Sequence, residues 1–73
     1  MIIMLNTTFI EQLRQNQGYT QEQIAIMLGY NTQAAYSKKI KDAKRFTIDD
    51  IIALCRIYNV EPNQLIIIEK VGK

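Results

Sequence analysis

Residues 18–40 decide the fold of this chain, and they read GYTQEQIAIMLGYNTQAAYSKKI. Apolar residues recur at helical spacing on both sides of Gly29, first around Ile24 and then around Tyr36. Glycine at this place supplies the left-handed backbone conformation that a tight turn between helices requires. The second segment ends in the lysines at positions 38 and 39. The stretch therefore predicts two short helices joined by a glycine turn, the second with a basic end.

Helix starts are marked by three threonines, each followed three residues later by a side chain that can complete a capping box. In such a box, the hydroxyl accepts a hydrogen bond from the amide of the third helical residue, and the side chain of that residue reaches back. The pairs are Thr8 with Glu11, Thr20 with Gln23, and Thr47 with Asp50. The start of the third helix stays open, since either Asn31 or Thr32 can cap it.

Five helices follow from these starts and from the apolar spacing. They are expected over residues 9–17, 21–28, 33–40 and 48–58, with a short fifth helix opened by Glu61 and Pro62. Gly18, Gly29 and Asn59 end the first, second and fourth helices, and residues 41–46 form a loop. The side chains expected to face the core are Phe9, Ile10, Leu13, Ile24, Ala25, Leu28, Tyr36, Ile40, Phe46, Ile51, Ile52, Leu54, Cys55, Tyr58, Leu65 and Ile66.

The two ends of the chain depart from this helical pattern. Residues 1–5 and 66–71 are rich in β-branched and other apolar side chains, which favours strands that can pair as a small two-stranded sheet. The expected fold is an all-α, compact five-helix domain over residues 1–73, with the helix-turn-helix proper over about residues 20–40.

The composition excludes several classes of protein. The chain has 73 residues, 48% of them hydrophobic and 22% charged, which is a globular balance. Cys55 is the only cysteine and there is no histidine, so a disulfide framework and the usual zinc-ligand clusters are excluded within one chain. A cytoplasmic protein without cofactor or metal is expected. The apolar runs are far shorter than the ~20 residues that span a bilayer, so no membrane association is expected.

Positive charge is concentrated in one place. Five basic residues and one acidic residue lie between Lys38 and Arg45, a local net charge of +4 in a chain whose total is +2. Such a basic run, placed at the end of the second helix of the motif, indicates nucleic acid as a partner.

Catalysis is not expected. The sequence shows no nucleophile with a base, no metal cluster and no phosphate-binding glycine loop, and hence no sign of a small-molecule substrate. The adjacent carboxylates Asp49 and Asp50 are explained by helix capping and by the helix dipole. Tyr36 is expected to pack in the core and not to stack on a nucleic-acid base. Tyr19 and Tyr58 are expected to be partly buried, with their hydroxyls at the surface.

The order and spacing of several fragments resemble the Cro/repressor type of helix-turn-helix domain, a family of small phage and bacterial regulators. The resemblance covers roughly residues 9–66. The fragments that carry it are Leu13-Arg14, residues 19–25 (YTQEQIA), Leu28-Gly29-Tyr30, residues 37–41 (SKKIK), residues 46–52 (FTIDDII) and residues 59–65 (NVEPNQL).

The resemblance implies that the third helix enters the major groove of double-stranded DNA while the second lies across the phosphate backbone. By position, the residues implied to contact bases are Thr32, Gln33, Ser37 and Lys38. Those implied to contact phosphates are Gln21, Asn31, Lys41, Lys44 and Arg45. Gln33 is the strongest candidate, because glutamine can form two hydrogen bonds with adenine. No arginine lies in the third helix, and the segment before Ser37 is one residue longer than the commonest spacing.

Two functions follow. The first is a sequence-selective transcriptional regulator that binds a two-fold operator as a homodimer. The alternative keeps the fold and changes the partner: an antirepressor or modulator that binds another repressor protein, with the apolar chain ends offering a strand edge.

Overall fold

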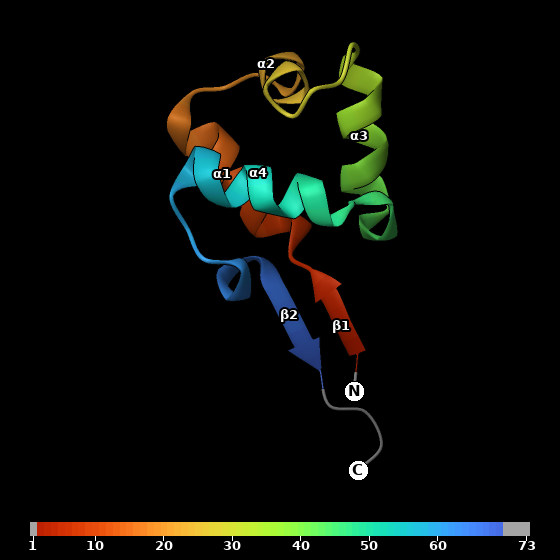
Figure 1. Ribbon diagram of the computed structural model, residues 1–73, viewed down its shortest axis with the longest axis vertical. Helices are drawn as coiled ribbons and strands as arrows, with labels where there is room; N and C mark the ends of the chain where they lie inside the picture. The colour runs from red at the N-terminus through yellow and green to blue at the C-terminus, as the bar shows by residue number, and fades with distance from the viewer. Residues whose placement is uncertain (1, 70–73) are drawn as a thin grey trace.

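The computed structural model describes residues 2–69 of the chain. Its elements are β1 (Ile2–Leu5), α1 (Thr7–Gln17), α2 (Gln21–Met27), α3 (Gln33–Lys41), the 3₁₀ turn η1 (Ala43–Arg45), α4 (Ile48–Tyr58), the 3₁₀ turn η2 (Pro62–Leu65) and β2 (Ile66–Glu69). The helices α1 and α4 cross the middle of the molecule, α2 and α3 lie along two adjoining sides, and the two strands project from the opposite end (Figure 1). The helix-turn-helix is thereby held away from the sheet.

Two of the three expected capping boxes are present. The Thr20 hydroxyl accepts from the Gln23 amide at 3.0 Å while the Gln23 side chain accepts from the Thr20 amide at 2.8 Å, and Thr47 pairs with Asp50 in the same way. The predicted box of Thr8 with Glu11 was wrong. Helix α1 begins earlier, at Thr7, and the Asn6 side chain caps it by accepting from the Phe9 amide at 3.0 Å.

A contact with a residue distant in the sequence holds Asn6 in its capping position. Its backbone amide donates to the carbonyl of Leu65 at 2.8 Å, so the chain is tied down at the point where β1 ends. The helix then starts directly after the strand, with the side chain of Asn6 in capping position. The open choice for α3 is also decided, because Thr32 and not Asn31 caps this helix, accepting from the Ala35 amide at 3.3 Å.

Left-handed residues end the helices where they were expected. Gly18 follows α1 with φ of 78°, Gly29 follows α2 with φ of 95°, and Asn59 follows α4 with φ of 55°. Glycine and asparagine are the residues that adopt this conformation most readily. Helix α4 has the predicted bounds, and α1, α2 and α3 differ from the prediction by one or two residues at one end.

The core is formed by one cluster of buried side chains from every helix and from η2. Its members are Ile10, Ile24, Ala25, Tyr36, Leu54, Tyr58 and Leu65. Most of the other expected core residues are partly buried against this cluster, Cys55 among them, and burial raises the pKa of the Cys55 thiol. Two expectations were wrong: Ile52 is 43% exposed, and the Tyr58 hydroxyl is buried, with no hydrogen-bond partner among the described residues.

The chain ends form the expected small sheet. β1 and β2 pair antiparallel, with Leu5 opposite Ile66 and Ile2 opposite Glu69; Met1, Lys70 and Val71, which were also expected in strands, lie outside the described residues. The expected fifth helix is only the 3₁₀ turn η2, since Ile66 already starts β2. Within residues 2–69, no helix has the length and apolar character needed to cross a membrane.

Candidate nucleic-acid interface

Helices α2 and α3 form the helix-turn-helix. Ile24 and Ala25 of α2 and Tyr36 of α3 have no exposed surface, and the Tyr30 amide donates to the Ala25 carbonyl at 2.9 Å to close the turn. Because Tyr36 faces inward, the opposite side of α3 faces solvent. The exposed side chains at the start of α3 and along it are Asn31, Thr32, Gln33, Ala34, Lys38 and Lys41, with Ser37 partly exposed.

Gln21 joins the two helices of the motif. Its side-chain oxygen Oε1 accepts from Gln33 Nε2 at 3.2 Å and from Ser37 Oγ at 2.9 Å. Three residues that sequence reasoning selected separately, one for a phosphate and two for bases, therefore lie together. The start of α2 and the exposed face of α3 form one continuous polar surface.

Glu11 on α1 supports this surface from behind. Its carboxylate oxygens accept from Gln21 Nε2 at 3.2 Å, from the Tyr36 hydroxyl at 2.6 Å and from two nitrogens of Arg14, each at 2.9 Å. Burial alone would raise the pKa of Glu11, but the hydrogen bonds from Arg14, Tyr36 and Gln21 outweigh burial and hold the pKa below its ordinary value. Glu11 is therefore ionised at neutral pH.

Sequence reasoning missed the position of Glu11, which it had assigned to the capping of α1. No local pattern signals this position, because the partners of Glu11 on α2 and α3 follow it by 10 and 25 residues. The ring of Tyr36 is buried and its hydroxyl is bonded to Glu11, which confirms the expected core position of Tyr36.

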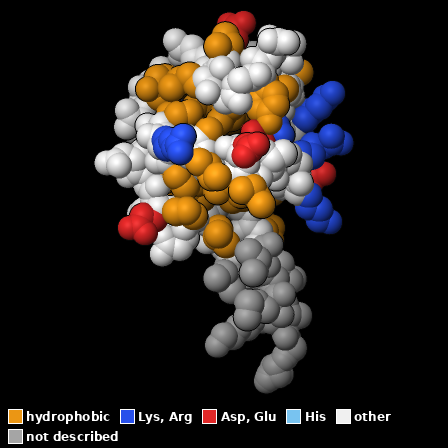
Figure 2. Space-filling view, in the orientation of Figure 1, with side chains coloured by type: hydrophobic (Ala, Val, Ile, Leu, Met, Phe, Trp, Pro, Cys, Tyr) orange, Lys and Arg blue, Asp and Glu red, His pale blue; other side chains and the backbone are white. Residues whose placement is uncertain are grey.

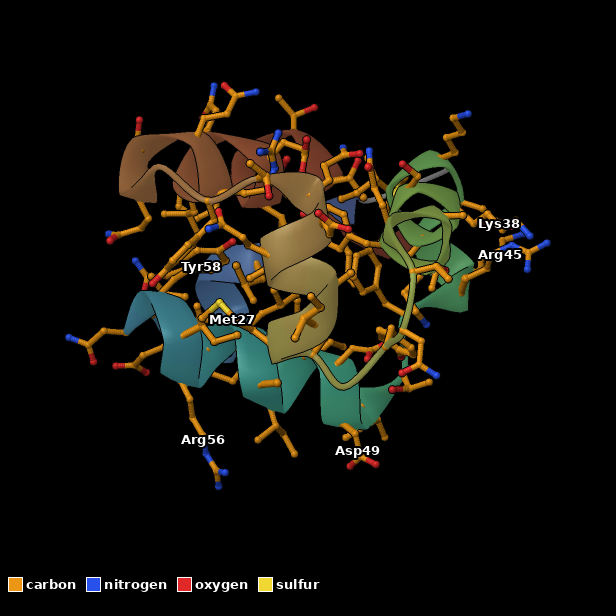
Figure 3. All side chains as sticks on the ribbon, turned by 90° about the horizontal axis from the view of Figure 1, so that it is seen from above. Met27, Lys38, Arg45, Asp49, Arg56 and Tyr58 are labelled. Carbon is orange, nitrogen blue, oxygen red and sulfur yellow. The ribbon has the colours of Figure 1, made fainter. Side chains whose placement is uncertain are left out.

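Exposed basic side chains lie at the end of α3 and on η1. Lys38, Lys41, Lys44 and Arg45 all face solvent, and cationic side chains gather on this side of the molecule (Figure 2). Lys38 and Arg45 extend toward the same side from α3 and η1 (Figure 3). Arg45 Nε lies 3.7 Å from Asp42 Oδ2, but both side chains are mostly exposed and such a pair is weak.

Lys39 does not belong to this basic surface, although sequence reasoning counted its charge there. It is only 9% exposed. Its Nζ lies 2.9 Å from Asp50 Oδ2 and donates to the Arg45 carbonyl at 2.7 Å. It also sits 4.9 Å from the ring centre of Tyr30. Lys39 therefore holds the segment after α3 against α4, and four basic residues of the segment remain for a partner.

Asp50 has two structural roles at once. It completes the cap of α4 by accepting from the Thr47 amide at 2.9 Å, and it accepts from the Tyr30 hydroxyl and pairs with Lys39. Burial by itself would raise the pKa of Asp50, but these hydrogen bonds and the charge of Lys39 outweigh it and lower the pKa. Within residues 2–69, no group of three or more potential metal ligands occurs.

Of the remaining candidates, Thr32 is exposed, but its hydroxyl is engaged in capping α3. Asn31 is exposed immediately before it, at the N-terminal end of α3.

Comparison with known proteins gave one match. A sequence profile described as helix-turn-helix matches residues 10–65, which include most of α1 and all of α2, α3 and α4. No curated protein and no solved structure matches the chain.

Proposed function

Because the chain belongs to the Cro/C1-type helix-turn-helix family of DNA-binding regulators, we propose that it is a phage or bacterial transcriptional regulator that recognises a specific operator sequence. The observation that carries the proposal is the joint surface of α2 and α3. There the exposed Gln33 is oriented by Gln21, and exposed lysines flank it. Polar side chains specify bases, while the surrounding cations bind phosphates of any sequence.

Gln33 is the principal base reader in this proposal, since a glutamine amide matches the N6 and N7 atoms of adenine. Thr32, Ser37 and Lys38 complete the set that faces base edges. Lysine at position 38 offers a single ammonium in place of the fork of an arginine, so its contribution to guanine recognition is limited. The phosphate contacts come from Gln21, Asn31, Lys41, Lys44 and Arg45.

A homodimer would place two copies of α3 about 34 Å apart on one face of the DNA. The sheet of β1 and β2 supports this part of the proposal. A two-stranded sheet is marginally stable by itself, and its outer side chains Met4 and Ile67 are 45% and 36% exposed. Pairing with a second copy would cover them.

Selection of bound sequences from a random duplex pool tests the regulator proposal. An enriched two-fold sequence is expected, and affinity must fall with rising salt because phosphate contacts release counterions. Gln33→Ala should then cost about 1–3 kcal/mol at particular base pairs, whereas Lys44→Ala should weaken all sequences alike and reduce the salt slope by about one unit. Affinity that does not change with salt concentration, or a selection in which no sequence is enriched, contradicts the proposal.

One observation favours the alternative function of an antirepressor. An open apolar groove of about 530 Å³ lies beside the basic surface. It is lined by Met4, Leu5, Phe46, Ile51 and Ile66 together with residues 41–44, which include Lys41 and Lys44. A repressor that inserted apolar side chains there would cover two proposed phosphate contacts. Titration of the protein with the repressor encoded beside its gene, in the presence and absence of duplex DNA, separates the two functions. Tight protein binding without DNA binding would favour the alternative.

A further inference from the structure

We propose that Glu11, a residue of α1 behind the DNA-facing surface, sets the base preference of Gln33 by fixing the direction in which the Gln21 side-chain amide points. Three side chains from three helices carry this relay, and only Gln33 would touch a base. The inference rests on the proposed function, because it concerns how the same surface of α3 reads DNA.

The first step of the relay is the acceptor character of Glu11. An ionised carboxylate has no hydrogen to donate and about four acceptor positions. All four are filled, two by Arg14, one by the Tyr36 hydroxyl and one by Gln21 Nε2. Gln21 must therefore turn its NH₂ group toward α1, because turning its oxygen there would place two acceptors face to face.

The second step transmits this direction to α3. With its NH₂ group facing α1, Gln21 presents Oε1 to α3, and this oxygen accepts from Gln33 Nε2 at 3.2 Å and from Ser37 Oγ at 2.9 Å. A carbonyl oxygen has two lone pairs, so both are used. Gln33 and Ser37 thus each commit one donor inward.

The third step is the pattern left facing DNA. Gln33 keeps a free oxygen and one N–H, an acceptor beside a donor. Adenine presents the N6 donor beside the N7 acceptor in the major groove, whereas guanine presents two acceptors, O6 and N7. The outward pattern of Gln33 matches adenine and opposes guanine. With Gln21 reversed, its NH₂ group would face α3 and Gln33 would turn its oxygen inward. The order of acceptor and donor that Gln33 presents to the DNA would then be reversed, and the match to the N6 and N7 atoms of adenine would be lost.

The variant Glu11→Gln tests the relay. An amide at position 11 can show Gln21 either its oxygen or its NH₂ group, so both directions of Gln21 become possible. The readout is the ratio of affinities for the selected operator and for the same operator with guanine in place of the adenine that Gln33 contacts. The wild-type ratio should be about 10-fold or more, and it should fall below about 3-fold in the variant. Non-specific affinity, set by the lysines, should stay within about 2-fold.

Tyr36→Phe is the matched control. It removes another donor from the same carboxylate and leaves the bond between Glu11 and Gln21, so the adenine preference should persist. A second variant, Gln21→Met, keeps Glu11 with Arg14 and the length of the side chain at position 21 but cuts the relay. It should lose the preference even if Glu11→Gln does not fold. A loss of stability alone would lower affinity for both operators equally, and would leave the ratio unchanged.

The outcomes separate the inference from the proposed function. Wild-type protein that selects an operator, together with relay variants that keep the wild-type ratio, overturns the inference and leaves the regulator proposal standing. A wild-type protein that binds no duplex DNA overturns the regulator proposal and the inference with it.

Discussion

Replacing Lys39 by methionine should destabilise the protein far more than the same change at its neighbour Lys38. The Lys39 side chain is 11% exposed and that of its partner Asp50 is 4% exposed, with Nζ and Oδ2 2.9 Å apart. Methionine keeps most of the apolar stem and removes the charge. The Asp50 carboxylate would then be buried without its cation, which is the costly way to break an ion pair.

The expected loss is about 3–5 kcal/mol in the free energy of unfolding, as for other buried pairs that lose one partner. A domain of this length has about 4–11 kcal/mol in total, at about 0.05–0.15 kcal/mol per residue. Lys39→Met should therefore be close to the limit of folding. Lys38 is exposed, and Lys38→Met should change stability by less than about 0.5 kcal/mol.

Urea unfolding followed by circular dichroism measures both variants, and a double variant completes a thermodynamic cycle. Lys39→Met with Asp50→Asn removes both charges, so the double variant should lose less than the two single losses added together. Equal urea midpoints for Lys39→Met and Lys38→Met would refute the structural role of Lys39. Additivity of the single losses would refute the coupling between Lys39 and Asp50.

Three further predictions concern stability. Tyr58→Phe should raise the free energy of unfolding by about 1 kcal/mol, because it removes a buried hydroxyl that has no hydrogen-bond partner within residues 2–69; thermal unfolding should show a midpoint several degrees higher, and a lower midpoint contradicts this. Since the pKa of Asp50 is held below its ordinary value, its ionisation stabilises the fold above about pH 4 and this contribution disappears as the pH falls through the lowered pKa. Urea midpoints of the wild type should therefore approach those of Asp50→Asn below about pH 4, and a constant difference down to pH 2 would be contrary to the prediction. Gly29→Ala should lower the free energy of unfolding by about 1 kcal/mol or more, because alanine is strained at φ of 95°; the loss would not come from a clash, because an added Cβ meets no atom within 4 Å. Gly29→Asn, measured by the same melting curves, should cost less, because asparagine adopts positive φ more readily.

Local signals predicted most of the helical pattern. The boxes of Thr20 and Thr47 and the left-handed residues Gly18, Gly29 and Asn59 are where the sequence indicated them. These features depend on groups within five residues of one another, as in the bonds from the Tyr19 amide to the Arg14 carbonyl and from the Val60 amide to the Cys55 carbonyl. The stabilisation that these caps and turns supply therefore does not depend on how the helices pack against one another.

Two of the wrong predictions, the cap at Thr8 and the core position of Ile52, share a different cause. Thr8 has the local sequence expected of a capping residue, since Glu11 follows it by three positions. The hydrogen bond from the Asn6 amide to the Leu65 carbonyl instead places Asn6 at the cap, so that the helix starts at Thr7. Ile52 has the apolar character of a core residue, but its face of α4 is left partly exposed by the neighbouring helices. In both cases a contact distant in the sequence, or its absence among the described residues, overrides the local preference.

The sequence by itself determined four helices to within two residues, the caps of α2 and α4, the glycine turn and the family to which the chain belongs. Only the tertiary structure decided which polar side chains work together. It moved Lys39 from the basic surface to a pair with Asp50, and it brought Glu11, Gln21 and Gln33 into one chain of hydrogen bonds. The physical reason is separation: these partners are 10 to 12 residues apart, and they meet only because the four helices that carry them pack around one core.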